Sequence, residues 1–179
     1  MLQHDLPGGC SIRLFEESDA AEFFAVIDRN RDHLAPWLPW VQPAYDLSSA
    51  LAFIRATHRQ LERNDGFQSA IVCDGAIVGV VGFHHVDWQN RATSIGYWLA
   101  AGHEGRGTMT AAVGALLDHA FGVWRLERVE IQAAVENRRS RAVPERLGFR
   151  EEGVRSQAER HGDHFVDLVL YAMLAADWT

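Results

Sequence analysis

The spacing of apolar residues along the chain alternates between a helical and a strand period. After Asp19 and Glu22, which have capping-box spacing, the apolar residues predict a helix that ends near Arg31. After Asp46, helical spacing continues over residues 47–63. The most regular pattern predicts a helix over residues 108–121 with one buried stripe: Met109, Ala112, Val113, Leu116, Leu117, Ala120 and Phe121.

The strand period occurs in seven short runs. They cover residues 11–15, 67–73, 76–85, 92–100, 128–135, 149–157 and 165–173, with a short helix predicted over residues 138–147. Asp74-Gly75 between the second and third runs is a strong hairpin signal. Helices between strand runs, together with an internal hairpin, indicate an α/β (α+β) fold with a mixed sheet of about seven strands flanked by helices.

Composition adds limits on domain number and partners. The 179 residues carry a net charge of -7 and are 47% apolar, which is typical of one globular domain spanning residues 1–179. All 17 basic residues are arginine, and the acidic balance argues against nucleic acid as a partner, because binding to a phosphate backbone needs a basic surface.

The two cysteines, Cys10 and Cys73, are too few for a disulfide framework and lack zinc-site spacing. We find no signal-peptide pattern and no apolar stretch of membrane-spanning length. These observations predict a reducing, cytoplasmic location, no membrane association and no metal site.

A glycine-rich turn, residues 101–107, precedes the most regular helix. Gly105 and Gly107 allow close approach of the backbone to a ligand, the first helical N–H groups lack partners, and Arg106 can contact a phosphate. An ordinary strand-to-helix connection would use the same glycines. A Walker loop is excluded because the chain has no lysine, and a dinucleotide fingerprint would need a third glycine where Thr110 stands.

Gly102-His-Glu-Gly-Arg-Gly-Thr-Met-Thr110 resembles the acetyl-coenzyme A pyrophosphate loop of the GNAT acetyltransferases, Gln/Arg-x-x-Gly-x-Gly/Ala, with departures at Glu104 and Met109. Other segments look like the RimJ/RimL-type N-terminal acetyltransferase branch, in order over residues 10–178. They are Trp37-Leu-Pro-Trp40, Ile95-Gly-Tyr-Trp-Leu99, Glu136-Asn-Arg-Arg-Ser-Arg141, Glu145-Arg-Leu-Gly-Phe149 and Val166-Asp-Leu-Val-Leu-Tyr171.

The resemblance implies acetyl-coenzyme A as the cofactor, bound where the fourth and fifth strands splay apart. It implies that the pyrophosphate lies on the turn formed by Glu104, Gly105, Arg106, Gly107, Thr108, Met109 and Thr110. Backbone groups of Trp98, Leu99 and Ala100 would hold the pantetheine arm, and Arg141 would add a phosphate contact. Asn137 and Ser140 would lie beside the thioester.

Acetyl transfer to an amine needs a neutral nucleophile and a proton for the departing thiolate. Ser140 is our candidate proton donor and Asn137 a candidate anchor for an amide. Many members of the branch have a glutamate where Ser94 stands, so the general base is predicted elsewhere. His85 shares a strand face with Asp87 and is chosen over His84, Asp87, Glu104 and Tyr97.

Trp37 and Trp40, held rigid by neighbouring prolines, are expected to line the acceptor pocket together with Ser94 and Tyr97. Tyr45 and Trp88 could form its opposite wall.

The predicted activity is acetyl transfer to a protein or peptide N-terminal α-amine, for example of a ribosomal protein. An α-amine is easier to deprotonate than a lysine side chain by about 2.4 pKa units, or roughly 3.3 kcal/mol. The alternatives are a small-molecule amine acceptor, such as an antibiotic, polyamine or amino acid, and a non-catalytic acyl-coenzyme A-binding module. A homodimer is a further expectation from the resemblance.

Overall fold

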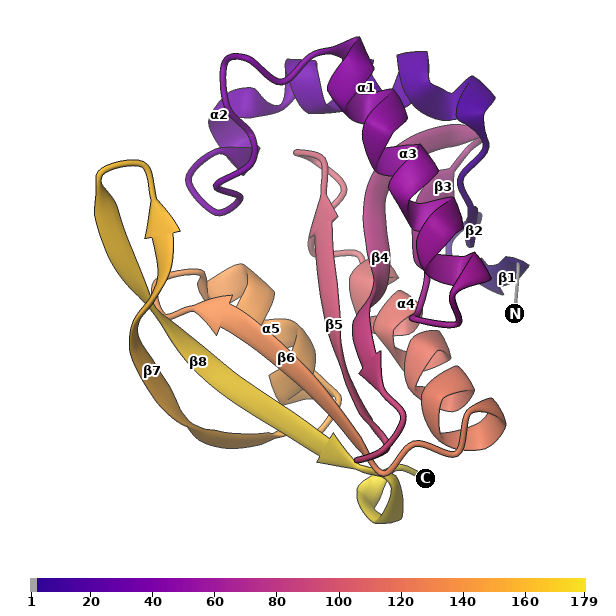
Figure 1. Cartoon of the computed structure of the whole chain (residues 1–179), viewed down its shortest axis with the longest axis vertical. Coiled ribbons are helices and arrows are strands. Elements are labelled where there is room, and N and C mark those ends of the chain that lie inside the picture. The colour runs from indigo at the N-terminus through magenta and orange to yellow at the C-terminus, as the bar shows by residue number, and fades with distance from the viewer. Residues whose placement is uncertain (1–2) are drawn as a thin grey trace.

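The computed structural model describes residues 3–179 and contains one eight-stranded sheet with helices on both faces (Figure 1). The strand order is β1-β2-β3-β4-β5-β6-β8-β7, antiparallel throughout except for the parallel pair β5 and β6. The strands are β1 (Gln3–Leu6), β2 (Cys10–Leu14), β3 (Gln68–Cys73), β4 (Ala76–Asp87), β5 (Ala92–Leu99), β6 (Arg128–Ala134), β7 (Arg150–His161) and β8 (His164–Leu174). The predicted mixed sheet is confirmed; β1, a short and mostly polar edge strand, was not predicted.

The helices divide between the two faces of the sheet. They are α1 (Ala20–Arg29), α2 (Arg31–Leu34), α3 (Leu47–Glu62), α4 (Thr108–Leu117) and α5 (Arg138–Arg146). One core joins α1 and α3 to alternate strand residues such as Ala70 and Val80. The residues next to these, Ile71 and Val81, join a second core with α4 and α5 on the opposite face. The strand period therefore supplies both cores from the same strands.

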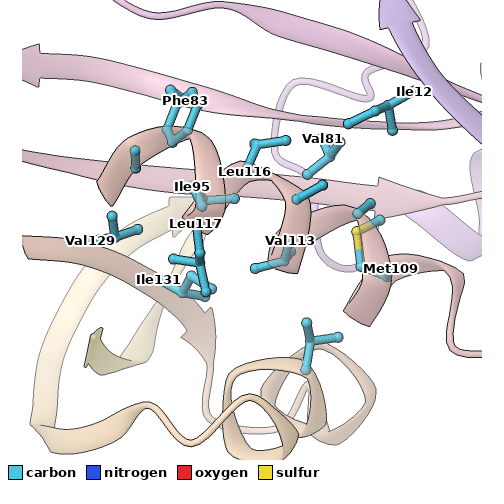
Figure 2. Packing of buried hydrophobic residues seen from close by; sticks show 14 of the residues in the cluster. Ile12, Val81, Phe83, Ile95, Met109, Val113, Leu116, Leu117, Val129 and Ile131 are labelled. Carbon is cyan, nitrogen blue, oxygen red and sulfur yellow. The ribbon is translucent and has the colours of Figure 1, made fainter. Parts of the chain in front are cut away.

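The predicted apolar stripe of α4 is buried in the second core (Figure 2). Val113, Leu116 and Leu117 are 0% exposed and pack beside Val81, Phe83, Ile95, Val129 and Ile131. Only Phe121 of the predicted stripe is half-buried. The helix beyond Leu117 continues as a π-helical turn, Asp118–Val123, which buries His119.

Strands β5 and β6 separate after a short paired stretch. Their register joins Ala92 to Arg128, Thr93 to Val129 and Ser94 to Glu130, and the rest of β5 pairs only with β4. In Figure 1 the end of β5 nearest α2 stands clear of β6. These are the fourth and fifth strands of the sequence prediction, so the predicted splay is confirmed.

The start of α1 differs from the prediction. Asp19 and Glu22 do not form a capping box for α1. The box lies one turn earlier, between Glu16 and Asp19, because the Asp19 carboxylate is also held by Arg13. Glu22 instead accepts a hydrogen bond from the backbone N–H of Ile77. The local spacing was ambiguous because partners distant in sequence determine which carboxylate caps the turn.

Cys10 and Cys73 lie directly opposite each other on β2 and β3 and form a disulfide in the structure. Disulfides persist in oxidising compartments and are rare in the cytosol. The cysteine spacing did not indicate this pairing, because the register of β2 and β3 brings the two thiols together. Among the described residues, the longest helices are too short or too polar to cross a membrane.

Candidate active site

A cavity of about 1800 Å³ opens where β5 and β6 part. Its walls come from the free half of β5, the N-terminal turns of α4 and α5, and an aromatic segment running from α1 to α3. Trp37, Trp40, Ser94, Tyr97, Trp98, Leu99, Glu104, Gly105, Gly107, Thr108, Met109, Thr110, Asn137 and Ser140 all line it. The structure thus brings together most of the site residues that the sequence predicts.

The start of α4 presents unused backbone donors to this cavity. Gly107 is the N-terminal cap residue in a left-handed conformation (φ 81°), and within residues 3–179 no side chain caps the helix. Gly105 is also left-handed (φ 75°), and a Cβ atom at either glycine would meet nothing within 4 Å. The first N–H groups of a helix have no partner inside it and carry partial positive charge. The turn therefore fits a diphosphate.

The start of α5 is capped. The Asn137 side chain accepts a hydrogen bond from the Ser140 backbone N–H at 3.1 Å, and the Tyr97 hydroxyl donates to the Ser140 carbonyl at 2.8 Å. Burial raises the pKa of Tyr97, so its phenol stays protonated at neutral pH. The Ser140 hydroxyl makes no hydrogen bond to any residue in the part of the chain that the structure describes. It remains free to face a ligand.

Two predicted arginine contacts do not reach the cavity. The Arg141 guanidinium binds the Tyr171 hydroxyl and the Val135 carbonyl, which directs it into the protein. Arg106 is also outside the lining. The arginines that do line the cavity are Arg138, Arg139 and Arg146. The helical period of α5 could have indicated this, since Arg139 and Arg146 are seven residues apart and share a face.

Glu104 connects the two sides of the cofactor end of the cavity. Its carboxylate accepts from the Gly102 N–H at 2.7 Å and pairs with Arg139 at 3.1 Å and His33 at 3.3 Å. Burial alone would raise the pKa of Glu104, but hydrogen bonds from backbone N–H groups and the nearby His33 and Arg139 outweigh it and lower that pKa. The group is ionised and holds α2 and α5 near the turn.

The backbone at the end of β5 is only partly free. Ala100 donates its N–H to the Val78 carbonyl and does not line the cavity, while the Leu99 carbonyl lies 3.2 Å from His33 Nε2. Trp98 and Leu99 do line it. Of the three predicted pantetheine contacts, Trp98 and Leu99 therefore remain.

The other end of the cavity is aromatic. The Trp40 ring lies 5.3 Å from Tyr45 and 6.4 Å from Trp98, and Phe23 and Phe53 stack behind them. Burial, aided by Asp46, raises the pKa of Tyr45 to about 12. Trp88 lies elsewhere, against Trp124, because its indole N–H donates to the Asn64 carbonyl. It does not form the opposite wall that the sequence suggested.

The two adjacent histidines of β4 have opposite environments. A bulge in the β4–β5 register lies between Phe83 and Val86. His85 points away from the cavity, with Nδ1 2.6 Å from Asp65 and its side chain 76% exposed. His84 lines the cavity, and its Nδ1 lies 2.9 Å from the Ser94 hydroxyl. The structure therefore does not place His85, the predicted base, or its proposed partner Asp87 near the other site residues.

Comparison with known proteins agrees with this architecture. Residues 11–150 match the model of the acetyltransferase (GNAT) domain family. YdaF of Bacillus subtilis, provisionally named a ribosomal N-acetyltransferase, is 39% identical over 94% of this chain and 92% of its own length. The ribosomal-protein-serine acetyltransferase of Escherichia coli is 28% identical over 88% of each chain.

Among the similar solved structures are proteins in complex with acetyl-CoA or another form of coenzyme A. The microcin C7 self-immunity acetyltransferase MccE, in complex with acetyl-CoA and AMP, superimposes with a TM-score of 0.89 at 26% identity, covering 93% of each chain. Mycobacterium smegmatis RimJ, in complex with CoA-disulfide, gives a TM-score of 0.86 at 29% identity, covering 94% of this chain and 83% of RimJ. The chain belongs to the GNAT acetyltransferase family and is an acetyl-coenzyme A-dependent N-acetyltransferase of the RimJ/RimL-like type.

Proposed function

We propose that the acceptor is the N-terminal α-amine of a protein or peptide, such as a ribosomal protein. The observation that carries this proposal is the chemistry of the acceptor wall. In the described part of α1 through α3, the residues lining the cavity include no carboxylate. They are Phe23, His33, Leu34, Trp37, Leu38, Pro39, Trp40, Tyr45 and Phe53. The carboxylates elsewhere in the lining are Glu104, Glu136 and Glu159, of which Glu104 already pairs with Arg139 and Glu159 lies 2.6 Å from His161 Nε2. A polyamine would therefore bury several positive charges with few free anionic partners, which is costly.

Two further considerations support an α-amine. Relatives at 28% and 26% identity are named a ribosomal-protein-serine acetyltransferase and a ribosomal-protein uS5-alanine N-acetyltransferase, both from Escherichia coli. In addition, an α-amine has a pKa near 8 whereas a lysine side chain has one near 10.4, so more of it is neutral at pH 7. Ribosomal acceptors would also place the enzyme in the cytoplasm, where Cys10 and Cys73 would be reduced.

Acetyl-coenzyme A supplies an activated acetyl group, and the residues around it position the two reactants. The N–H groups at the start of α4 bind the diphosphate, and Arg138, Arg139 and Arg146 add positive charge beside it. Asn137 uses its side-chain oxygen as the helix cap, which leaves its NH₂ group to hold an amide of cofactor or acceptor. The free Ser140 hydroxyl delivers the proton that the leaving thiolate requires.

The test is a thiol-release assay with acetyl-coenzyme A against peptides with different N-termini, free lysine, polyamines and amino sugars. We expect peptide N-termini to be acetylated at least tenfold faster than any lysine side chain at pH 7. A faster reaction with a polyamine or amino sugar would overturn the proposal in favour of a small-molecule acceptor. No reaction with any amine would favour an acyl-coenzyme A-binding module.

Ser140→Ala tests the proton donor, with Ser156→Ala on the exposed face of β7 as the matched control. We expect kcat to fall by about 100-fold or more in the first variant, with an unchanged KM for acetyl-coenzyme A, and no change in the second. Full activity of Ser140→Ala would remove this residue from the mechanism. A homodimer stays a prediction.

A further inference from the structure

The β4 bulge that contains His84 and His85 lies at the point where β5 and β6 begin to part. Ser94 is the last residue of β5 that pairs with β6, and the His84 side chain reaches it across the β4–β5 pair. The two-residue repeat of β4 places His84 on the same face as Val80, and both line the cavity. The bulge adds one residue to the strand, so that His85 turns to Asp65 while Val86 returns to the core beside Phe83.

Three features fix the His84 ring. The Gln60 side chain donates to the carbonyls of Phe83 and His84, and Gln68 donates to the Phe83 carbonyl, so two amides hold the bulge. A Cβ atom on Gly96 would lie 2.5 Å from His84 Nε2, so the ring occupies the space that a side chain would fill. Ser94 completes the arrangement at Nδ1.

Resting on the proposed acetyl transfer, we propose that His84, oriented by Ser94, is the general base that takes a proton from the acceptor ammonium. In the active tautomer Nδ1–H donates to the Ser94 oxygen, which leaves the lone pair of Nε2 for the acceptor, directly or through one water. Ser94 is the positioning residue. By the family resemblance, Ser94 stands where many members of the RimJ/RimL branch have a glutamate.

The proton balance of the step is complete. The ammonium gives one proton to His84, which later returns it to water. The neutral nitrogen then forms a bond to the acetyl carbon while the carbon–sulfur bond breaks, and the second nitrogen proton goes to the thiolate through Ser140. The product is an amide and a thiol, and no oxidant or metal takes part.

The electrostatic environment keeps His84 neutral. Burial by the surrounding cavity walls lowers its pKa below 6.5. Asp65 is engaged by His85 Nδ1 and the Val86 N–H. The other titratable groups that line the cavity are Tyr45, His33 and His103, Tyr97, Glu104, Glu136 and Glu159, and Arg138, Arg139 and Arg146. None of them contributes to the lowered pKa of His84. At pH 7 the ring is therefore available as a base.

The first test compares His84→Gln with His85→Gln, a matched change of the neighbouring residue. We expect His84→Gln to lower kcat for a peptide acceptor by 100-fold or more at pH 7, with the KM for acetyl-coenzyme A within twofold of the wild-type value. His85→Gln should retain the wild-type rate. Wild-type activity of His84→Gln would overturn the proposal. Absence of transfer by the wild type would instead refute the proposed function.

The second test separates catalysis from structure. The double variant His84→Gln/Ser94→Glu places a carboxylate at position 94 of β5. We expect its kcat to be at least tenfold higher than that of His84→Gln, with the acid limb of the pH profile moved to lower pH. Independently of activity, NMR titration of the His84 Cε1–H in the free protein should give a pKa below 6.5, and Ser94→Ala should change it. A failed recovery together with an unchanged titration would assign the pair a structural role only.

Discussion

Helices α4 and α5 both begin at the cavity, yet they use their first turns in opposite ways. In the described chain α4 has Gly107 as its cap residue and no side-chain cap, so its backbone donors remain available to a ligand. The first turn of α5 is closed by Asn137. The α5 helix therefore offers side chains instead, namely Ser140 and its arginines. The comparison indicates that a helix start offers an anion site when its first N–H groups have no side-chain cap, and that the presence of a helix start alone is not sufficient.

The largest expected effect comes from placing a charge at the open helix start. Gly107→Asp and Gly107→Asn add side chains of the same shape in the same left-handed conformation, which both residues tolerate. Only the aspartate repels a diphosphate. We expect the Kd for coenzyme A, measured by isothermal titration calorimetry, to rise by about 100-fold in Gly107→Asp and by less than fivefold in Gly107→Asn. Equal losses would show that charge is not the cause.

The far end of α4 also differs from that of α5, since its π-helical turn buries His119 among Phe67, Phe83 and Trp124. Burial lowers the pKa of His119 to about 4, whereas the unfolded value is near 6.5. The unfolded state therefore binds more protons between these values, and stability is lost as the pH falls. From pH 7 to pH 5 this amounts to about 2 kcal/mol.

Chemical denaturation of wild type and His119→Phe at both pH values checks this expectation. Between pH 7 and pH 5 the phenylalanine variant should lose about 2 kcal/mol less unfolding free energy than the wild type, because it lacks His119. His84 is present in both proteins, so its contribution cancels from the comparison. An identical pH dependence would contradict the burial of a neutral His119.

Opening the start of α5 should cost stability. Asn137→Ala removes the cap on the Ser140 N–H, which should destabilise the fold by about 1 kcal/mol and lower Tm by about 2–4 °C. Asn137→Asp keeps the capping oxygen and should retain the wild-type Tm in a thermal melt. A melt of Asn137→Ala that matched the wild type would mean that the cap contributes nothing.

The smallest effect concerns Glu104, which sits between the two helix starts. Glu104→Gln removes a negative charge beside the cofactor turn and releases Arg139, whose side chain is 79% exposed. Exposed pairs contribute little, so we expect the KM for acetyl-coenzyme A to fall only about two- to fivefold, and less at high salt. An increase in KM would show that Glu104 holds the turn in its binding conformation.

Local sequence patterns predicted the features that depend only on residues close together in the sequence. The stripe of α4 and the Asp74-Gly75 turn follow from side-chain period and positive φ, and both are present. The splay and the cofactor loop were implied by the family resemblance rather than by periodicity. Residues 104–105 and 107–110 line the cavity as expected.

The differences between prediction and structure concern side chains whose direction is set by distant partners. Arg141 turns inward because Tyr171 of β8 accepts its hydrogen bond, and no pattern within α5 indicates this. His85 was preferred to His84 because it shares a strand face with Asp87, whereas the cavity lies on the face of Val80 and His84, which the local pattern does not reveal. Cys10 and Cys73 meet through the register of β2 and β3. Each difference is a tertiary effect on a correctly predicted element.

The most direct measurement of the central claim is the affinity of the wild type and Gly107→Asp for coenzyme A and for pantetheine, which lacks the diphosphate. If the open start of α4 holds the diphosphate, the wild type should bind coenzyme A at least 100-fold more tightly than pantetheine, and Gly107→Asp should reduce that ratio at least tenfold. A ratio that is the same in both proteins, or pantetheine binding as tight as that of coenzyme A, would contradict the account.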